Sequence, residues 1–350
     1  MEKYKRLDQI LNHQFLGDTP LSDFLYKRII KKSLESKNSL NENSHIFISG
    51  LARSGTTALL NKIYASGEVG SFLYKYMPFI LSPRFASIFS NFVKNDQTTI
   101  ERFHKDGIKI NQNSPECLDE VFWIKSKLSD STFPIEEKII EKILISYSYL
   151  LNEFARIQKK ERMVVKNNNN HFRLKSLLNY FPNSYFLLIF RDPLSHSSSL
   201  LSQHKNFLKI HNQNAYTLEY MNLIGHNEFG GNMKPFLYSN NDNDNDWCMK
   251  FNNLNINYWL MQWIESHQWF LKSGILKKNN LILVNYKNLC KEKDYFKKLC
   301  KKIKIKNNSL GNQFILKKKY ITNSLEIDSS ILGKAQNIYE ELLINSFKNQ

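Results

Sequence analysis

The chain has 350 residues, a mass of 41.4 kDa and a formal net charge of +17. This length can bury a large core, and we expect one large α/β domain with additions at both ends. No apolar stretch is long enough to cross a bilayer, and the N-terminus lacks the features of a signal peptide. We therefore expect a cytoplasmic protein without a transmembrane segment.

The positive charge would suit a polyanionic partner, but the lysines are spread along the whole chain. They are not gathered on one helix with aromatic residues between them, so we expect no nucleic-acid partner. The four cysteines form no CxxC pair, and we expect neither a zinc site nor disulfides, and no other metal. The sequence carries no signal for the oligomeric state.

Helices and strands alternate along the chain. Residues 1–40 predict an N-terminal helical extension, residues 41–310 the α/β domain, and residues 311–350 a helical tail packed on that domain. The strands are expected at residues 46–48, 69–73, 163–166, 185–190 and 281–286. The helices are expected at residues 56–64, 135–160, 172–180 and 255–271. This alternation predicts a parallel β-sheet flanked by helices on both faces, in three layers α/β/α.

The segment HIFISGLARSGTTALL, residues 45–60, predicts a strand, a phosphate-binding loop and the start of a helix. Two glycines allow a tight turn, and three hydroxyl side chains stand where the helix begins. These residues are Gly50, Gly55, Ser54, Thr56 and Thr57. The spacing matches the pattern GxxxxGK[ST], but Thr56 occupies the lysine position, which argues against ATP or GTP hydrolysis. Arg53 supplies positive charge instead, so we predict a P-loop-type fold whose ligand has a shorter anionic chain.

A second anion-binding signal follows the strand at residues 185–190. Arg191, Asp192 and Pro193 end that strand, and Ser199 lies 8 positions after Arg191, close to two helical turns. Ligands bind at the carboxyl ends of parallel strands, so Arg191 and the glycine loop would share one edge of the sheet. Two anion sites without a triphosphate lysine indicate a ligand that is phosphorylated at two separated places.

With these two motifs the chain resembles the sulfotransferases that depend on 3′-phosphoadenosine 5′-phosphosulfate (PAPS), and bacterial-type members above all. GLARSGTT is similar to the family's 5′-phosphosulfate loop, FRDPLSHSSSL to its 3′-phosphate motif, and LVNYKNL to a later YE-L element in which Lys287 replaces the glutamate. The resemblance extends from residue 45 to about residue 305. It implies that PAPS donates a sulfuryl group to a hydroxyl or amine acceptor by in-line displacement.

The resemblance also implies roles for single residues. Arg53, Ser54, Gly55, Thr56 and Thr57 would hold the 5′-phosphosulfate, and Arg191 and Ser199 the 3′-phosphate. In many cytosolic members a lysine, one residue and a histidine base follow the strand equivalent to residues 163–166. Here Lys166 is present and is included among the catalytic candidates, but Asn168 stands at the histidine position.

Sulfuryl transfer needs a base for the acceptor and cations at the leaving side. For the base we favour Glu120, then Glu116 or His104, because related sulfotransferases often carry acidic residues on a pocket-facing helix. Ser114 followed by Pro115 predicts the start of such a helix, with Glu116 and Glu120 on one face.

Two other classes of function stay open. A P-loop kinase, or a nucleotide-binding protein with a degenerate loop, would need a carboxylate for Mg²⁺, for which Asp192 is the candidate. A non-catalytic basic binding protein would explain the charge but not the two motifs. The acceptor could be a small molecule, a carbohydrate or a lipid, and we expect residues 74–85 and the loop around Phe229 to shape its pocket.

Overall fold

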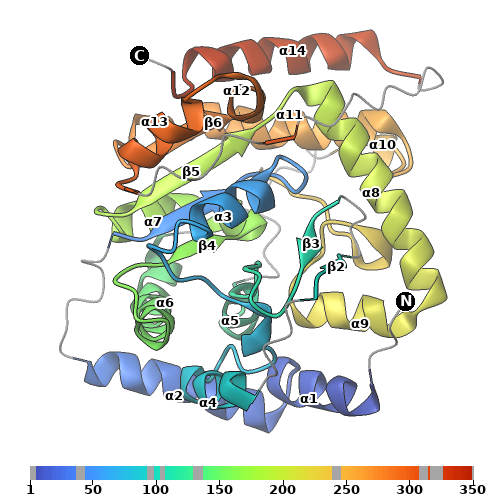
Figure 1. Cartoon of the computed structure of the whole chain (residues 1–350). Coiled ribbons are helices and arrows are strands. Elements are labelled where there is room, and N and C mark those ends of the chain that lie inside the picture. Colours follow the sequence, from blue (N-terminus) through green and yellow to red (C-terminus); the bar gives the residue numbers. More distant parts are fainter. Residues whose placement is uncertain are drawn as a thin grey trace.

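The computed structural model describes residues 5–36, 44–92, 98–102, 107–128, 137–238, 246–306, 314–315 and 326–348. At its centre is a parallel sheet, with four strands among the described residues, in the order β4-β1-β5-β6 (Figure 1). The strands are β1 (Ile46–Ser49), β4 (Val164–Lys166), β5 (Tyr185–Phe190) and β6 (Leu281–Asn285). A small antiparallel pair, β2 (Ile100–Glu101) and β3 (Lys109–Ile110), lies apart from this sheet.

Helices make up most of the remaining described chain. In chain order they are α1 (Arg6–Leu16), α2 (Pro20–Glu35), α3 (Thr56–Tyr64), α4 (Pro83–Phe92), α5 (Glu120–Lys125), α6 (Glu137–Ile157), α7 (Leu174–Tyr180), α8 (Pro193–Gln213), α9 (Ala215–Leu223), α10 (Trp247–Lys250), α11 (Ile256–Lys272), α12 (Tyr286–Lys291), α13 (Tyr295–Lys302) and α14 (Ser329–Ile344). Short 3₁₀ helices include η1 (Tyr74–Tyr76) and η2 (Asn168–Arg173).

Helices cover both faces of the sheet. Successive residues of each strand point to opposite faces, so each strand contributes side chains to both. In β1, Ile46 and Ile48 belong to a core cluster that includes side chains of α3 and α13, whereas Phe47 belongs to a second cluster that includes side chains of α6, α7, α8 and α11. Strands buried on both faces read as continuous apolar runs, which is why the sequence could locate them. The fold is the predicted three-layer α/β arrangement.

Most predicted elements are confirmed. The helix expected at residues 56–64 is α3, and the strand expected at residues 185–190 is β5. Thr19 caps the N-terminus of α2, since its hydroxyl accepts the Ser22 N–H at 3.2 Å. Trp259 and Trp263 of α11 lie in the core, and Trp269 is half-buried against it.

Two predicted elements are wrong. Residues 69–73 form no strand; Gly70 and Leu73 make only isolated bridges. The helix expected from Ser114 begins only at Glu120, because the preceding segment is held by the chain at residues 72–75. There the Glu116 N–H donates to the Phe72 carbonyl at 3.0 Å. Glu116 therefore lies in an extended segment and does not share a helix face with Glu120.

The N- and C-terminal helices lie at opposite ends of the molecule. Figure 1 shows α1, α2 and α4 at one end and α14 at the other. Helix α14 packs on α8 and α11, and Asn285 at the end of β6 donates to the Tyr339 hydroxyl at 3.2 Å. The division at residues 40 and 310 stays a prediction. Within the described ranges, no helix combines the length and apolar character needed to span a membrane.

Buried histidines make the stability of the fold depend on pH. Burial lowers the pKa of His45 and of His171 to about 3, and that of His267 to about 4. Burial also holds the pKa of His196 well below its ordinary value. As the pH falls below about 6.5, only the unfolded chain protonates these side chains, so protonation favours unfolding. Burial raises the pKa of Asp119 to about 6, so the folded chain binds a proton there before the unfolded chain does. This single group opposes the trend.

We therefore expect the free energy of unfolding to fall as the pH is lowered from about 7 to about 4, because each buried histidine contributes up to about 1.4 kcal/mol per pH unit. His45→Asn removes one of these titrations, while its amide oxygen can still accept the Met163 N–H that His45 Nδ1 accepts at 3.1 Å. Urea denaturation across this pH range should give a shallower dependence for the variant. His13→Gln, at an exposed position of α1, is the control. Equal slopes for His45→Asn and the wild type would contradict the assignment.

Candidate functional site

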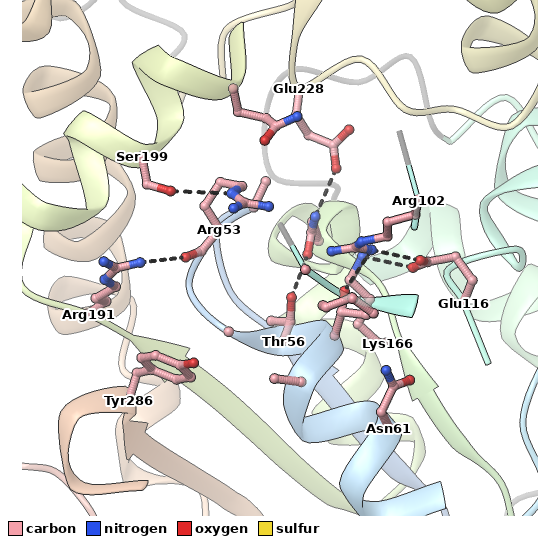
Figure 2. Close-up of a pocket in the computed structure, with 18 of the residues that line it drawn as sticks. Arg53, Thr56, Asn61, Arg102, Glu116, Lys166, Arg191, Ser199, Glu228 and Tyr286 are labelled. Atoms are coloured by element: carbon pink, nitrogen blue, oxygen red, sulfur yellow. Dashed lines mark hydrogen bonds and ion pairs between the residues drawn. The ribbon is translucent and has the colours of Figure 1, made fainter. Parts of the chain in front are cut away.

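A pocket of about 660 Å³ opens at the carboxyl edge of the sheet (Figure 2). Each strand of the sheet delivers a residue to it. Arg53 follows β1, Asn168 follows β4, Arg191 follows β5 and Tyr286 follows β6. In parallel sheets this edge is where ligands bind, so the topology itself brings the two predicted anion motifs together.

The loop at residues 50–57 requires both of its glycines. Gly55 has a φ of 108°, and a Cβ there would lie 2.3 Å from the Tyr286 ring. A Cβ on Gly50, where φ is 152°, would lie 2.6 Å from the Ile189 carbonyl oxygen. The buried, neutral His196 also fastens the loop, because its Nε2 donates to the Ala52 carbonyl at 2.8 Å. These contacts thus define the loop conformation.

The predicted anion-binding residues largely meet in this pocket. The Arg53 Nε donates to the Ser199 Oγ at 3.3 Å, and an Arg191 Nη donates to the Arg53 carbonyl at 3.4 Å. Figure 2 shows these three residues side by side. Gly55, Thr56 and Thr57 also line the pocket.

Ser54 differs from the other predicted residues of the loop. It is fully buried and does not line the pocket. Its N–H donates to the Leu51 carbonyl at 3.1 Å, and its hydroxyl has no hydrogen-bond partner among the described residues. Ser54 thus belongs to the turn that shapes the loop.

Glu116 and Lys166 face the same cavity. Lys166 Nζ lies 3.5 Å from Glu116 Oε1, and Arg102 Nη1 donates to Glu116 Oε2 at 2.9 Å. Burial alone would raise the pKa of Glu116, but Lys166 and Arg102 together hold it far below its ordinary value. Glu116 is therefore an ionised, doubly paired carboxylate.

Glu120 lies beneath the site and does not line the pocket. Its carboxylate accepts two hydrogen bonds from Arg173, at 2.7 and 3.2 Å, and both side chains are fully buried. Asn167, the residue after β4, donates to Glu120 at 2.6 Å and to Asp119 at 3.2 Å. This ion pair anchors the turn that carries Lys166 and Asn168. The remaining candidate base, His104, lies outside the described residues.

Sequence reasoning missed Arg102 and Glu228 as pocket residues. Glu228 is half-buried and accepts from Asn168 Nδ2 at 2.8 Å, and Asn168 Oδ1 in turn accepts from Thr56 Oγ1 at 3.4 Å. The signal for Glu228 was its place beside Phe229, because the loop around Phe229 does line the pocket as expected. The segment at residues 74–85 does not contribute to the described lining.

Cations outnumber carboxylates around the cavity. The described lining includes five cationic side chains, Arg53, Lys62, Arg102, Lys166 and Arg191, and two carboxylates, Glu116 and Glu228. Such a surplus in a concave site favours a ligand with several negative charges. Within the described ranges, no group of three or more histidine, cysteine, aspartate or glutamate side chains could hold a metal ion.

The buried ion pair between Glu120 and Arg173 leads to a testable prediction about stability. Glu120→Gln would leave the Arg173 charge buried without its counter-ion, so we expect the free energy of unfolding to fall by about 3 kcal/mol. Glu35→Gln, which removes two exposed ion pairs on α2, should change it by less than about 1 kcal/mol. Chemical denaturation measures both variants. An unfolding free energy of Glu120→Gln close to that of the wild type would contradict the anchoring role.

Comparison with known proteins gives a family. The model of the sulfotransferase family matches residues 45–227, a span that includes the 50–57 loop, Arg191 and Ser199. Two similar solved structures are sulfotransferases STF1 from Mycobacterium tuberculosis H37Rv and STF9 from Mycobacterium avium. For STF1 the identity is 12%, the TM-score 0.45, and the coverage 98% of this chain and 82% of that chain. For STF9 the identity is 11%, the TM-score 0.44, and the coverage 94% of this chain and 75% of that chain. No curated protein shows significant similarity.

Proposed function

The chain belongs to the sulfotransferase family, and we propose that it moves a sulfuryl group from PAPS to a hydroxyl or amine acceptor by in-line displacement. One observation carries this proposal. Two motifs that lie far apart in the sequence meet through the contact of Arg53 with Ser199 and of Arg191 with the Arg53 carbonyl. A single cavity with two adjacent anion-binding groups suits a donor that is phosphorylated at two places.

The residues present fit such a donor. Gly55, Thr56 and Thr57 of the loop line the cavity, and the described lining carries a surplus of cations. We assign the 5′-phosphosulfate to Arg53, Gly55, Thr56 and Thr57, with the buried Ser54 supporting the loop. We assign the 3′-phosphate to Arg191 and Ser199.

The chemistry requires charge stabilisation at the leaving side. When bound, PAPS supplies the sulfuryl group and the nucleotide leaving group. Arg53 and the N-terminus of α3 would offset the negative charge that grows on the bridging oxygen. Lys166, held in the same cavity by Glu116, would add a second cation. Neither role requires a metal.

The kinase alternative receives less support. Thr56 stands where a kinase of this loop type needs its lysine. The candidate Mg²⁺ ligand, Asp192, instead begins α8, since its Oδ1 accepts the Ser195 N–H at 2.9 Å. Asp192 is also absent from the described pocket lining. A cytoplasmic location, and an acceptor among small molecules, carbohydrates or lipids, stay predictions.

The donor site can be tested without knowing the acceptor. Isothermal titration with adenosine 3′,5′-bisphosphate should show binding to the wild type. Arg191→Ala should weaken it by about 10- to 100-fold, because a charge-assisted contact to phosphate is lost. Arg84→Ala, at an exposed position of α4, should bind as the wild type does. No binding to the wild type, or tighter binding of ATP with Mg²⁺, would overturn the proposal.

A further inference from the structure

Glu116 and Glu228 are the carboxylates that the described lining offers as proton acceptors. Glu116 is poorly suited to this task. Its Oε2 accepts from Arg102 at 2.9 Å and from the Tyr74 hydroxyl at 3.4 Å. Its Oε1 accepts the Cys117 N–H at 3.0 Å and contacts Lys166. A proton on Glu116 would have to displace these partners, so this carboxylate resists protonation.

Glu228 has the opposite environment. Its Oε1 accepts one hydrogen bond, from Asn168, and no described residue donates to its Oε2. The side chain is half-buried and points toward the cavity in Figure 2. Asn168 also contacts Thr56 of the anion-binding loop, so Glu228 lies two hydrogen bonds from the group that would hold the phosphosulfate. This position is within reach of an acceptor bound next to that loop.

We propose that Glu228 is the general base of the transfer, an inference that rests on the proposed function. The acceptor O–H gives its proton to Glu228 Oε2 as its oxygen forms a bond to sulfur. The bond between sulfur and the oxygen of the 5′-phosphate breaks, and the electron pair leaves with adenosine 3′,5′-bisphosphate. Asn168 is a positioning residue, because its amide cannot take the proton but orients Glu228.

The same surroundings point to the class of acceptor. Next to Glu228 the pocket is lined by polar groups, among them Asn168, His226 and Lys166. Phe229 lines it too, but it is only 2% exposed and stacks on Phe207. Asn168, His226 and Lys166 already have partners within the chain, but Glu228 Oε2 accepts no hydrogen bond from a described residue, and the Lys166 ammonium has N–H groups beyond the one near Glu116. A polyhydroxylated molecule can bond to both of these groups, whereas a flat apolar phenol offers a single hydroxyl. The structure assigns to this side of the pocket an uncharged, sugar-like polyol.

The base is tested with PAPS hydrolysis, in which water is the acceptor and no other ligand needs to be known. Glu228→Gln keeps an oxygen for Asn168 but loses the charge, so the hydrolysis rate should fall about 100-fold or more. Glu228→Asp should retain more of the rate than Glu228→Gln. The Kd for adenosine 3′,5′-bisphosphate and the thermal unfolding midpoint should stay at their wild-type values. Glu219→Gln, an exposed carboxylate on α9, is the matched control.

The outcomes separate this inference from the proposed function. A wild type that binds no bisphosphate overturns the function itself, whatever the variants do. If the wild type binds and hydrolyses PAPS, a hydrolysis rate of Glu228→Gln within about threefold of the wild-type rate overturns the assignment of Glu228 as the base. Loss of the rate in His226→Gln but not in Glu228→Gln does the same.

The acceptor class is tested with labelled PAPS and two groups of probes. Glucose, lactose and inositol represent polyols, and 2-naphthol and 4-nitrophenol represent apolar phenols. We expect turnover above the rate of hydrolysis with at least one polyol, and none with the phenols. Stimulation by a phenol alone, or by no probe, would overturn the assignment of the acceptor class.

Discussion

The site depends on the position of β1 between two parallel neighbours. Ile48 of β1 pairs with Lys166 of β4 on one side and with Leu187 of β5 on the other. This register sets the 50–57 loop, the turn after Lys166 and the turn with Arg191 at one edge. A slip by one residue would place Phe47 where Ile46 and Ile48 pack, so the different side chains buried on the two faces enforce the register. The geometry of the pocket is therefore a consequence of core packing.

The pairing of buried charges then determines which acidic side chain reaches the cavity and which stays in the core. The segment before α5 supplies Glu116 to the cavity wall, and the first residue of α5, Glu120, lies in the core beneath it. Pairing offsets part of the desolvation cost of Glu120 and Arg173, and the hydrogen bond that Asn167 donates to Glu120 holds the end of β4. An apolar pair of equal volume would fill the space but could not bind Asn167. We infer that this buried pair serves to position the site.

The sequence predicted the fold and the two anion motifs because their signals are local. A buried strand, a glycine turn and a helix start lie within residues 45–60, and the second motif within 185–199. The carboxylates depended on tertiary contacts. Glu120 belongs to a buried ion pair because the segment before it pairs with residues 72–75, which no local pattern reveals. Glu228 reaches Asn168 across 60 positions, and only the folded chain brings them together.

With Glu228 as the proposed base, its contact with Asn168 accounts for an amide at the position after β4. In-line displacement separates two tasks, since the base must face the attacking oxygen and the cations must face the leaving group. A base carried by the strand turn itself would need one residue to contact both the loop and the acceptor. Here Asn168 contacts Thr56 of the loop, and the carboxylate comes from the segment after α9. The position of the base would then depend on the packing of that segment. This packing could change with the acceptor without disturbing the loop.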